Sequence, residues 1–135
     1  MAVGAEVEIK DHPGYMPLKA DPGLDKVLIG AATELYGEKE IKLGEHGTGS
    51  TDMGDYSCIM PTSGISMIGT EGSLHSRHLK IVDPVKQYIV PAKVIALSVI
   101  DLLYDGAPKA LEIIKNFEPV VKSDKYVEFM NELVK

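Results

Sequence analysis

The stretch YIVPAKVIALSVIDLLY, residues 88–104, decides which kind of fold this chain adopts. From Val94 to Leu103 a helix is apolar on nearly every side, which is typical of a helix that other parts of the protein cover. Pro91, Lys93 and Asp101 interrupt the stretch, so it falls short of the roughly 20 clean apolar residues that a membrane span needs. We therefore predict a helix covered on most sides, in a soluble protein without a membrane partner.

A pair of residues before this stretch predicts where the helix begins. Asp83 and Pro84 form a helix-start signal, because an aspartate caps the first turn and a proline fits the first helical position. The helical pattern continues to Tyr104, and Pro91 either kinks the helix or restarts it.

A second Asp-Pro pair predicts an earlier helix. Asp21 is expected as its N-cap, Pro22 as its first residue and Gly37 as its C-cap. One face of this segment carries an apolar stripe at helical spacing, formed by Leu24, Val27, Leu28, Ala31 and Leu35.

Short elements complete the predicted fold. Residues 3–9 alternate between apolar and polar side chains, which predicts a half-buried strand that pairs with a remote segment or with another chain. A buried strand is also possible at residues 65–68. Two amphipathic helices are expected at about residues 108–117 and about residues 123–134, the second with Ser123 as N-cap. The class is α/β, helix-rich, with two to four short strands.

The composition excludes several classes of function. The 135 residues suit one ordinary domain, and 44% hydrophobic with 25% charged residues is the balance of a globular chain. The net charge of -6 argues against nucleic-acid binding, which needs clustered Lys and Arg. Cys58 is the only cysteine, so no internal disulfide can form, and we expect a reducing cytoplasm. The N-terminus shows neither the basic nor the apolar region of a leader.

The polar stretch GEHGTGSTDMGDYS, residues 44–57, is the first candidate site. It lacks the Lys and the glycine spacing of a phosphate-binding loop, and its acidic residues are too few and wrongly spaced for a calcium loop. The residues favour a helix start, with Ser50 or Thr51 as the cap and with Asp52 and Asp55 in the first turn.

Histidines form the second candidate site. His75 and His78 lie in a Gly- and Ser-rich stretch that is typical of a loop. A zinc site needs three or four ligands, and His46 and Asp52 are further candidates that no spacing brings together. A loop histidine taken alone is more often a surface residue. Cys58 lies in an apolar setting and is predicted to be a small core residue rather than a reactive thiol.

Several motifs, in one order and at consistent distances, together resemble a known family. They are GAEVEIKDHPGYMPL, EHGTGSTDMGDYSCIMP, LHS, IVDP and PAKVIALSVIDLL. The chain resembles the last third of the M20 metallopeptidases, in the amidohydrolase branch that includes p-aminobenzoyl-glutamate hydrolase and related N-acyl amino acid and dipeptide hydrolases. The resemblance covers nearly the whole chain, from Val3 to about Phe117.

This resemblance implies a two-domain zinc enzyme with an inserted lid domain that dimerises. Residues 1–18 would be the last lid strand and a linker, and residues 19–135 would be the C-terminal part of the catalytic domain. His75 matches the family's final metal-binding histidine. The active-site loop is matched by Gly49, Ser50, Thr51, Asp52 and Asp55, with His46 just upstream.

The family's other metal ligands and its glutamate base lie in segments that this sequence does not contain. One ligand, His75, does not hold a catalytic metal alone. The stretch GTEGS before it also departs from the glycine-rich run of many members. We therefore expect either a fragment or subunit of an amidohydrolase that is inactive alone, or a non-catalytic remnant that self-associates. Its partner would be a second copy or the missing catalytic segment.

Overall fold

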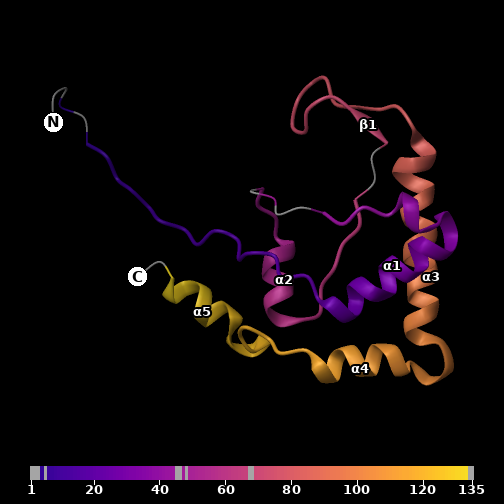
Figure 1. Ribbon diagram of the computed structural model, residues 1–135. Helices are drawn as coiled ribbons and strands as arrows, with labels where there is room; N and C mark the ends of the chain where they lie inside the picture. Colours follow the sequence, from indigo (N-terminus) through magenta and orange to yellow (C-terminus); the bar gives the residue numbers. More distant parts are fainter. Residues whose placement is uncertain (1–3, 5, 45–46, 48, 67–68, 134–135) are drawn as a thin grey trace.

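Two helices that pack side by side form the centre of the molecule in a computed structural model (Figure 1). They are α1 (Pro22–Tyr36) and α3 (Val90–Leu103). Their contact buries Val27 and Ala31 of α1 against the Val90 and Val94 side of α3. The structure describes residues 4, 6–44, 47, 49–66 and 69–133.

The predicted limits of α1 are confirmed. The Asp21 carboxylate accepts hydrogen bonds from the backbone N–H groups of Gly23 and Leu24, both at 2.9 Å. Gly37 has φ of 84° and donates its N–H to the Thr33 carbonyl at 2.8 Å. A positive φ is the conformation that glycine adopts without steric cost, which explains why the helix ends there.

The start of the long helix also follows its signal. The Asp83 carboxylate accepts the Lys86 N–H at 3.0 Å, as an N-cap does. The first helical segment, Val85–Ile89, is a π-helix (η2), and α3 continues it without a break. The wider turn lies directly before Pro91, where it relieves the clash that a proline ring makes with the carbonyl four residues earlier.

The prediction that α3 is covered on most sides is wrong for this chain. Val90, Val94 and Ser98 are buried, but the opposite side of the helix is open, with Ile95 51%, Val99 46% and Leu103 62% exposed. We call this open side the outer stripe, and it consists of Tyr88, Ala92, Ile95, Ala96, Val99 and Leu103. The described part of the chain supplies one helix layer against α3, and a helix that is apolar all round needs cover on both sides.

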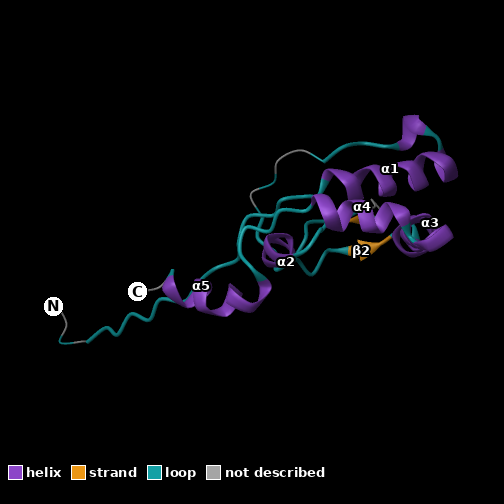
Figure 2. Ribbon diagram, turned by 90° about the horizontal axis from the view of Figure 1, so that it is seen from below, coloured by secondary structure: helices purple, strands orange, loops and turns teal. Residues whose placement is uncertain are grey.

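The remaining elements are short. They are η1 (Glu38–Glu40), α2 (Met53–Ile59), β1 (Thr70–Glu71), β2 (Lys80–Ile81), η3 (Tyr104–Gly106), α4 (Pro108–Asn116), η4 (Ser123–Lys125) and α5 (Tyr126–Glu132). The strands β1 and β2 pair antiparallel, with Thr70 opposite Ile81. Figure 2 shows how few strands accompany the helices. The prediction of a helix-rich fold with a few short strands is confirmed.

Three local predictions fail or cannot be compared. Residues 6–9 form no strand, and Val7 and Ile9 are each 79% exposed on a segment that runs away from the helices (Figures 1 and 2). Ser123 does not cap a helix, because η4 precedes α5 and no side-chain cap bond forms there. Of the possible strand at 65–68, residues 65–66 are irregular and residues 67–68 lie outside the described part.

The accessible surface quantifies how open the molecule is. It measures 10969 Å² for a mass of 14.6 kDa. A compact monomer of this mass exposes about 6,900 Å². The excess of roughly 4,000 Å² is several times the ~800 Å² that one partner contributes to a standard interface.

We expect Ser98→Ala to raise the free energy of unfolding by about 1 kcal/mol. The Ser98 side chain is buried on α3, and its hydroxyl has no hydrogen-bond partner among the described residues. Removal of an unsatisfied buried hydroxyl raises the free energy of unfolding. Alanine, the better helix former, raises it further. Urea denaturation followed by circular dichroism measures the change. A loss of stability would show that the hydroxyl has a partner.

Candidate functional site

His75 lies in the loop of the β1–β2 hairpin and is exposed. Its φ is 60°, in the left-handed region, where a residue other than glycine is uncommon. The loop is closed by the Ser76 hydroxyl, which donates to the Ser73 carbonyl at 2.8 Å, and by the Leu79 N–H, which donates to the Ser76 carbonyl at 3.2 Å. These turns shape the loop in which His75 is exposed to solvent.

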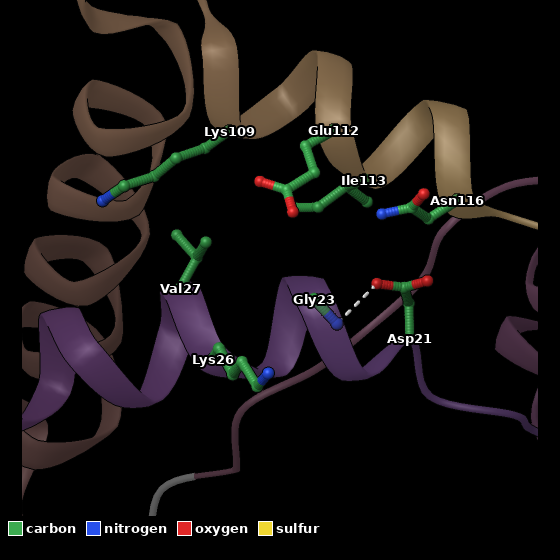
Figure 3. A pocket seen from close by; sticks show the side chains of 8 residues that line it. All are labelled: Asp21, Gly23, Lys26, Val27, Lys109, Glu112, Ile113 and Asn116. Carbon is green, nitrogen blue, oxygen red and sulfur yellow. Dashed lines mark hydrogen bonds between the residues drawn. The ribbon is translucent and has the colours of Figure 1, made fainter.

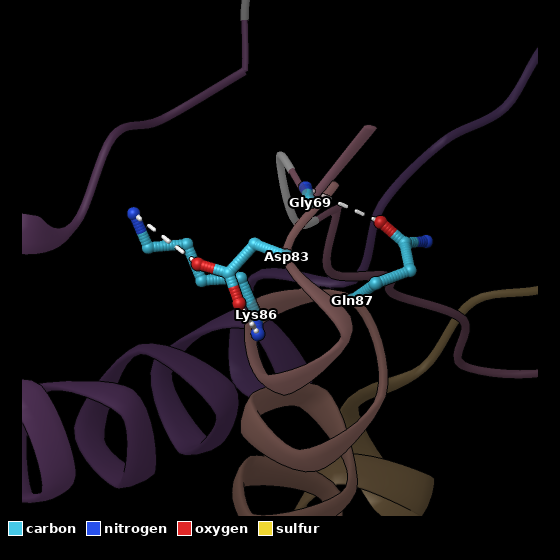
Figure 4. A network of polar contacts seen from close by, with 4 residues as sticks. All are labelled: Gly69, Asp83, Lys86 and Gln87. Atoms are coloured by element: carbon cyan, nitrogen blue, oxygen red, sulfur yellow. Dashed lines mark hydrogen bonds and ion pairs between the residues drawn. The ribbon is translucent and has the colours of Figure 1, made fainter. Parts of the chain in front are cut away.

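The base of this hairpin is tied to the first turn of the long helix (Figure 4). The Gly69 carbonyl accepts the N–H groups of Val82 and Asp83 at 2.9 and 3.1 Å, and the Gly69 N–H donates to the Gln87 side chain at 3.3 Å. A Cβ at Gly69 would lie 2.6 Å from the Asp83 carbonyl oxygen, so the close approach requires glycine. The base of the hairpin is therefore held against the first turn of the long helix.

The described residues do not form a metal centre by themselves. His75 and His78 are both exposed, and no group of three or more His, Cys, Asp or Glu side chains within the described ranges could hold a metal ion. His46, the third candidate histidine, lies outside those ranges. The one family-matched donor that can be placed is thus His75.

The predicted active-site loop leads directly into α2, as its helix-start pattern indicates. Gly49, Ser50, Thr51 and Asp52 are exposed, and the Thr51 hydroxyl accepts the Met53 N–H at 3.4 Å, a long bond. Asp52 occupies the N-cap position without making a side-chain cap bond. Thr51 therefore contributes the weak cap, and its hydroxyl also donates to the exposed Asp52 carboxylate at 3.3 Å.

Asp55 has a different role, because it points back into the protein. Its carboxylate accepts the Met16 N–H at 2.9 Å, and the Ser57 hydroxyl accepts the Lys19 N–H at 3.1 Å. The backbone of Met16 also lies directly against Gly54. These contacts join PGYMPL (residues 13–18) to GSTDMGD (residues 49–55), two motifs far apart in the sequence that both carry the family resemblance.

Sequence reasoning missed two residues of this cluster, Ser57 and Tyr126. Ser57 is buried and also donates its hydroxyl hydrogen to the Gly54 carbonyl at 2.6 Å. Tyr126 at the start of α5 lies close enough to Asp55 of α2 for that carboxylate to raise the pKa of its hydroxyl. Ser57, two residues after Asp55, fits no residue pattern that would have marked this serine as a site residue. Tyr126 lies far from the motif at residues 49–55.

Burial and the Asp55 charge change two pKa values beside α2. Burial, then the hydrogen bond to Asp55 and its charge, raise the pKa of Tyr126 to about 12. Burial raises the pKa of the Cys58 thiol above its usual value, and the Asp55 charge raises it further. The thiol is 2% exposed, so the prediction of a small core residue is confirmed, and a neutral buried thiol is a poor nucleophile.

These shifts predict a loss of stability at high pH. Both groups are held neutral in the folded protein, so the unfolded chain ionises first as pH rises. The stabilisation is complete below the ordinary pKa values of 9.0 for Cys58 and 10.0 for Tyr126, and it declines as pH rises toward about 12. Asp55→Asn keeps an acceptor for Met16 but removes the charge. We expect this variant to show a smaller decline in urea titrations between these pH values.

A pocket between α1 and α4 is a less suitable site (Figure 3). Its volume is about 220 Å³, below the range of most ligand sites. Two of its charged side chains are already engaged, since Asp21 caps α1 and the Lys109 amino group bonds Asp101 at 3.1 Å. No nucleophile with a neighbouring base lines it. We assign it no catalytic role.

Comparison of the chain with models of protein families, with curated proteins and with solved structures finds no match. The resemblance to the M20 enzymes stays a prediction from the sequence motifs. Among the helices of the described part, none is both long enough and apolar enough to cross a membrane.

The structure thus brings together one half of the predicted site and leaves the other half separate. Asp55 and the 13–18 segment meet at α2. Within the described ranges, no hydrogen bond joins the loop at residues 49–52 to the hairpin that carries His75.

Proposed function

We propose that this chain is the C-terminal part of a metal-dependent amidohydrolase of the M20 type, inactive alone. Its substrates are amides of the N-acyl amino acid, aminobenzoyl-glutamate or dipeptide class, in the cytoplasm. What carries the proposal is the contact between residues 13–18 and 49–55. The resemblance selects these two motifs from the sequence, and the fold places them against each other through Asp55 and Gly54.

The open surface supports the requirement for a further segment. An excess of roughly 4,000 Å² over a compact monomer is more than one standard interface covers. Exposed apolar side chains occur on α2, on the hairpin and on α4, for example Tyr56, Leu79 and Leu111. Surfaces of this kind are normally the inner faces of a larger core.

In the complete enzyme this chain supplies parts of the site rather than the whole site. His75 would contribute one imidazole to a zinc or similar divalent ion, carried on a hairpin whose base is held to the first turn of the long helix. The bound ion supplies Lewis-acid activation of water. The loop at residues 49–52 would face the substrate, and Asp55 is a positioning residue that holds this loop to the 13–18 segment.

An amidase assay on this chain alone, and on its mixture with a polypeptide that carries the family's remaining ligands, tests the proposal. We expect no turnover of aminobenzoyl-glutamate or N-acyl amino acids by the chain alone, and turnover with bound zinc in the mixture. Turnover with stoichiometric zinc in the isolated chain contradicts the requirement for a partner. If the mixture shows neither bound zinc nor turnover, the chain is the non-catalytic, self-associating remnant.

A further inference from the structure

The outer stripe of α3 is an apolar surface without a charged side chain. It faces away from α1, since the buried residues Val90, Val94 and Ser98 occupy the opposite side of the helix. Both views place α3 at the edge of the molecule (Figures 1 and 2). A second body can therefore reach the whole length of the stripe without moving another element.

The spacing along the stripe is that of a helix–helix contact. Tyr88, Ala92, Ile95 and Val99 follow one another at steps of four, three and four residues, and Leu102 or Leu103 continues the series. Steps of three and four keep side chains on one face, which is the pattern of a two-helix seam.

The side chains of the outer stripe also fit those of a second copy that runs in the opposite direction. When two copies of α3 run antiparallel about a two-fold axis between Lys93 and Val94, Ala92 of one copy meets Ile95 of the other. Tyr88 then meets Val99. Each contact pairs a larger side chain with a smaller one, and such pairs interdigitate without a void. A two-fold contact requires this property, because the same patch faces itself.

We propose that the outer stripe is the contact between two copies of this chain, packed as an antiparallel pair of α3 helices. The inference is independent of the proposed enzymatic function, because it uses only residues of η2 and α3.

The area of the stripe is enough for a modest dimer. Half-exposed Ile, Val, Leu and Tyr side chains, including the flanking Ile89 and Ile100, each offer roughly 60–100 Å² of apolar surface. Two copies together then bury about 1,000 Å², at the lower limit of a specific interface. We expect dissociation in the micromolar range. The excess surface exceeds this area, so a dimer leaves room for the segment proposed above.

Sedimentation equilibrium between about 1 µM and about 200 µM tests the dimer. The mass should rise from 14.6 kDa to twice that value and go no higher. Ile95→Glu places a charge in the seam and should weaken the dimer at least about 100-fold. Leu111→Glu is the matched control, because Leu111 is 60% exposed but lies on α4. It should behave as the unmodified chain, and circular dichroism verifies that both variants fold.

A cross-linking experiment covers the case in which Ile95→Glu fails to fold. Oxidation of a mixture of Ala92→Cys and Ile95→Cys chains should give a disulfide dimer of one chain of each kind. The yield of this mixed dimer should exceed the yield of the disulfide dimer that either variant forms with itself. Cys58 is buried and remains outside the reaction. A monomer at 200 µM, growth beyond a dimer, equal weakening by Leu111→Glu, or no excess of mixed dimer each overturns the proposal.

Discussion

Gly54→Ala is expected to lower the free energy of unfolding by about 3 kcal/mol or more, the largest stability change of any substitution considered. An ideal Cβ at Gly54 would overlap the Met16 carbonyl oxygen and lie 2.7 Å from the carbonyl carbon. Both are backbone atoms, so no side chain can rotate away. The 13–18 segment has to move off α2, and the Asp55 and Ser57 bonds to Met16 and Lys19 are lost with it.

Gly30→Ala is the matched control for this prediction. Gly30 lies within α1, and no heavy atom comes within 4 Å of an added Cβ. Alanine is the better helix former by about 1 kcal/mol, so this variant should be more stable than the unmodified chain. Urea denaturation of the two variants should shift the midpoint in opposite directions. An unchanged midpoint for Gly54→Ala would show that α2 and the 13–18 segment do not touch in solution.

The second large effect concerns the proposed enzyme. In the active mixture, His75→Asn should reduce turnover by more than about 100-fold and release the metal, because loss of even an indirect partner of a metal ligand costs 10–100-fold. Asparagine is chosen because it tolerates a positive φ, so the hairpin conformation at 60° is kept. Zinc content by mass spectrometry and turnover are measured together on the same sample.

His78→Asn is the control, since His78 is exposed in the same hairpin loop but matches no family ligand. It should retain both the metal and the activity. Equal losses from the two variants would assign the effect to the hairpin rather than to a ligand. Full activity of His75→Asn would remove His75 from the metal site, while the dimer through α3 would stand unaffected.

The predictions that succeeded rest on interactions between neighbours in the chain. Asp21 and Gly37 mark the ends of α1 because a cap bonds backbone groups within a few residues. Asp83 starts the long helix for the same reason. Such signals are complete in the sequence, and no distant segment is needed to read them.

The predictions that failed concern surfaces that only a segment distant in the sequence, or another chain, can cover. The alternation at residues 6–9 suits a strand, but a strand needs a neighbour to bond its backbone, and this segment has none among the described residues. The apolar character of α3 likewise predicted burial on most sides, whereas α1 covers one side. An apolar pattern shows that a segment needs a partner surface, but it does not show which part of the protein provides that surface.

The candidate site divides in the same way. The motifs predicted the α2 start and selected His75, whereas the link from Asp55 to Met16 spans 39 residues and is visible only in the fold. The sequence by itself determined where the principal helices begin and end, because caps and prolines act within one turn. The tertiary structure alone decided which side of α3 is buried and why residue 54 is a glycine. Both depend on which distant backbone or side chain arrives at that point.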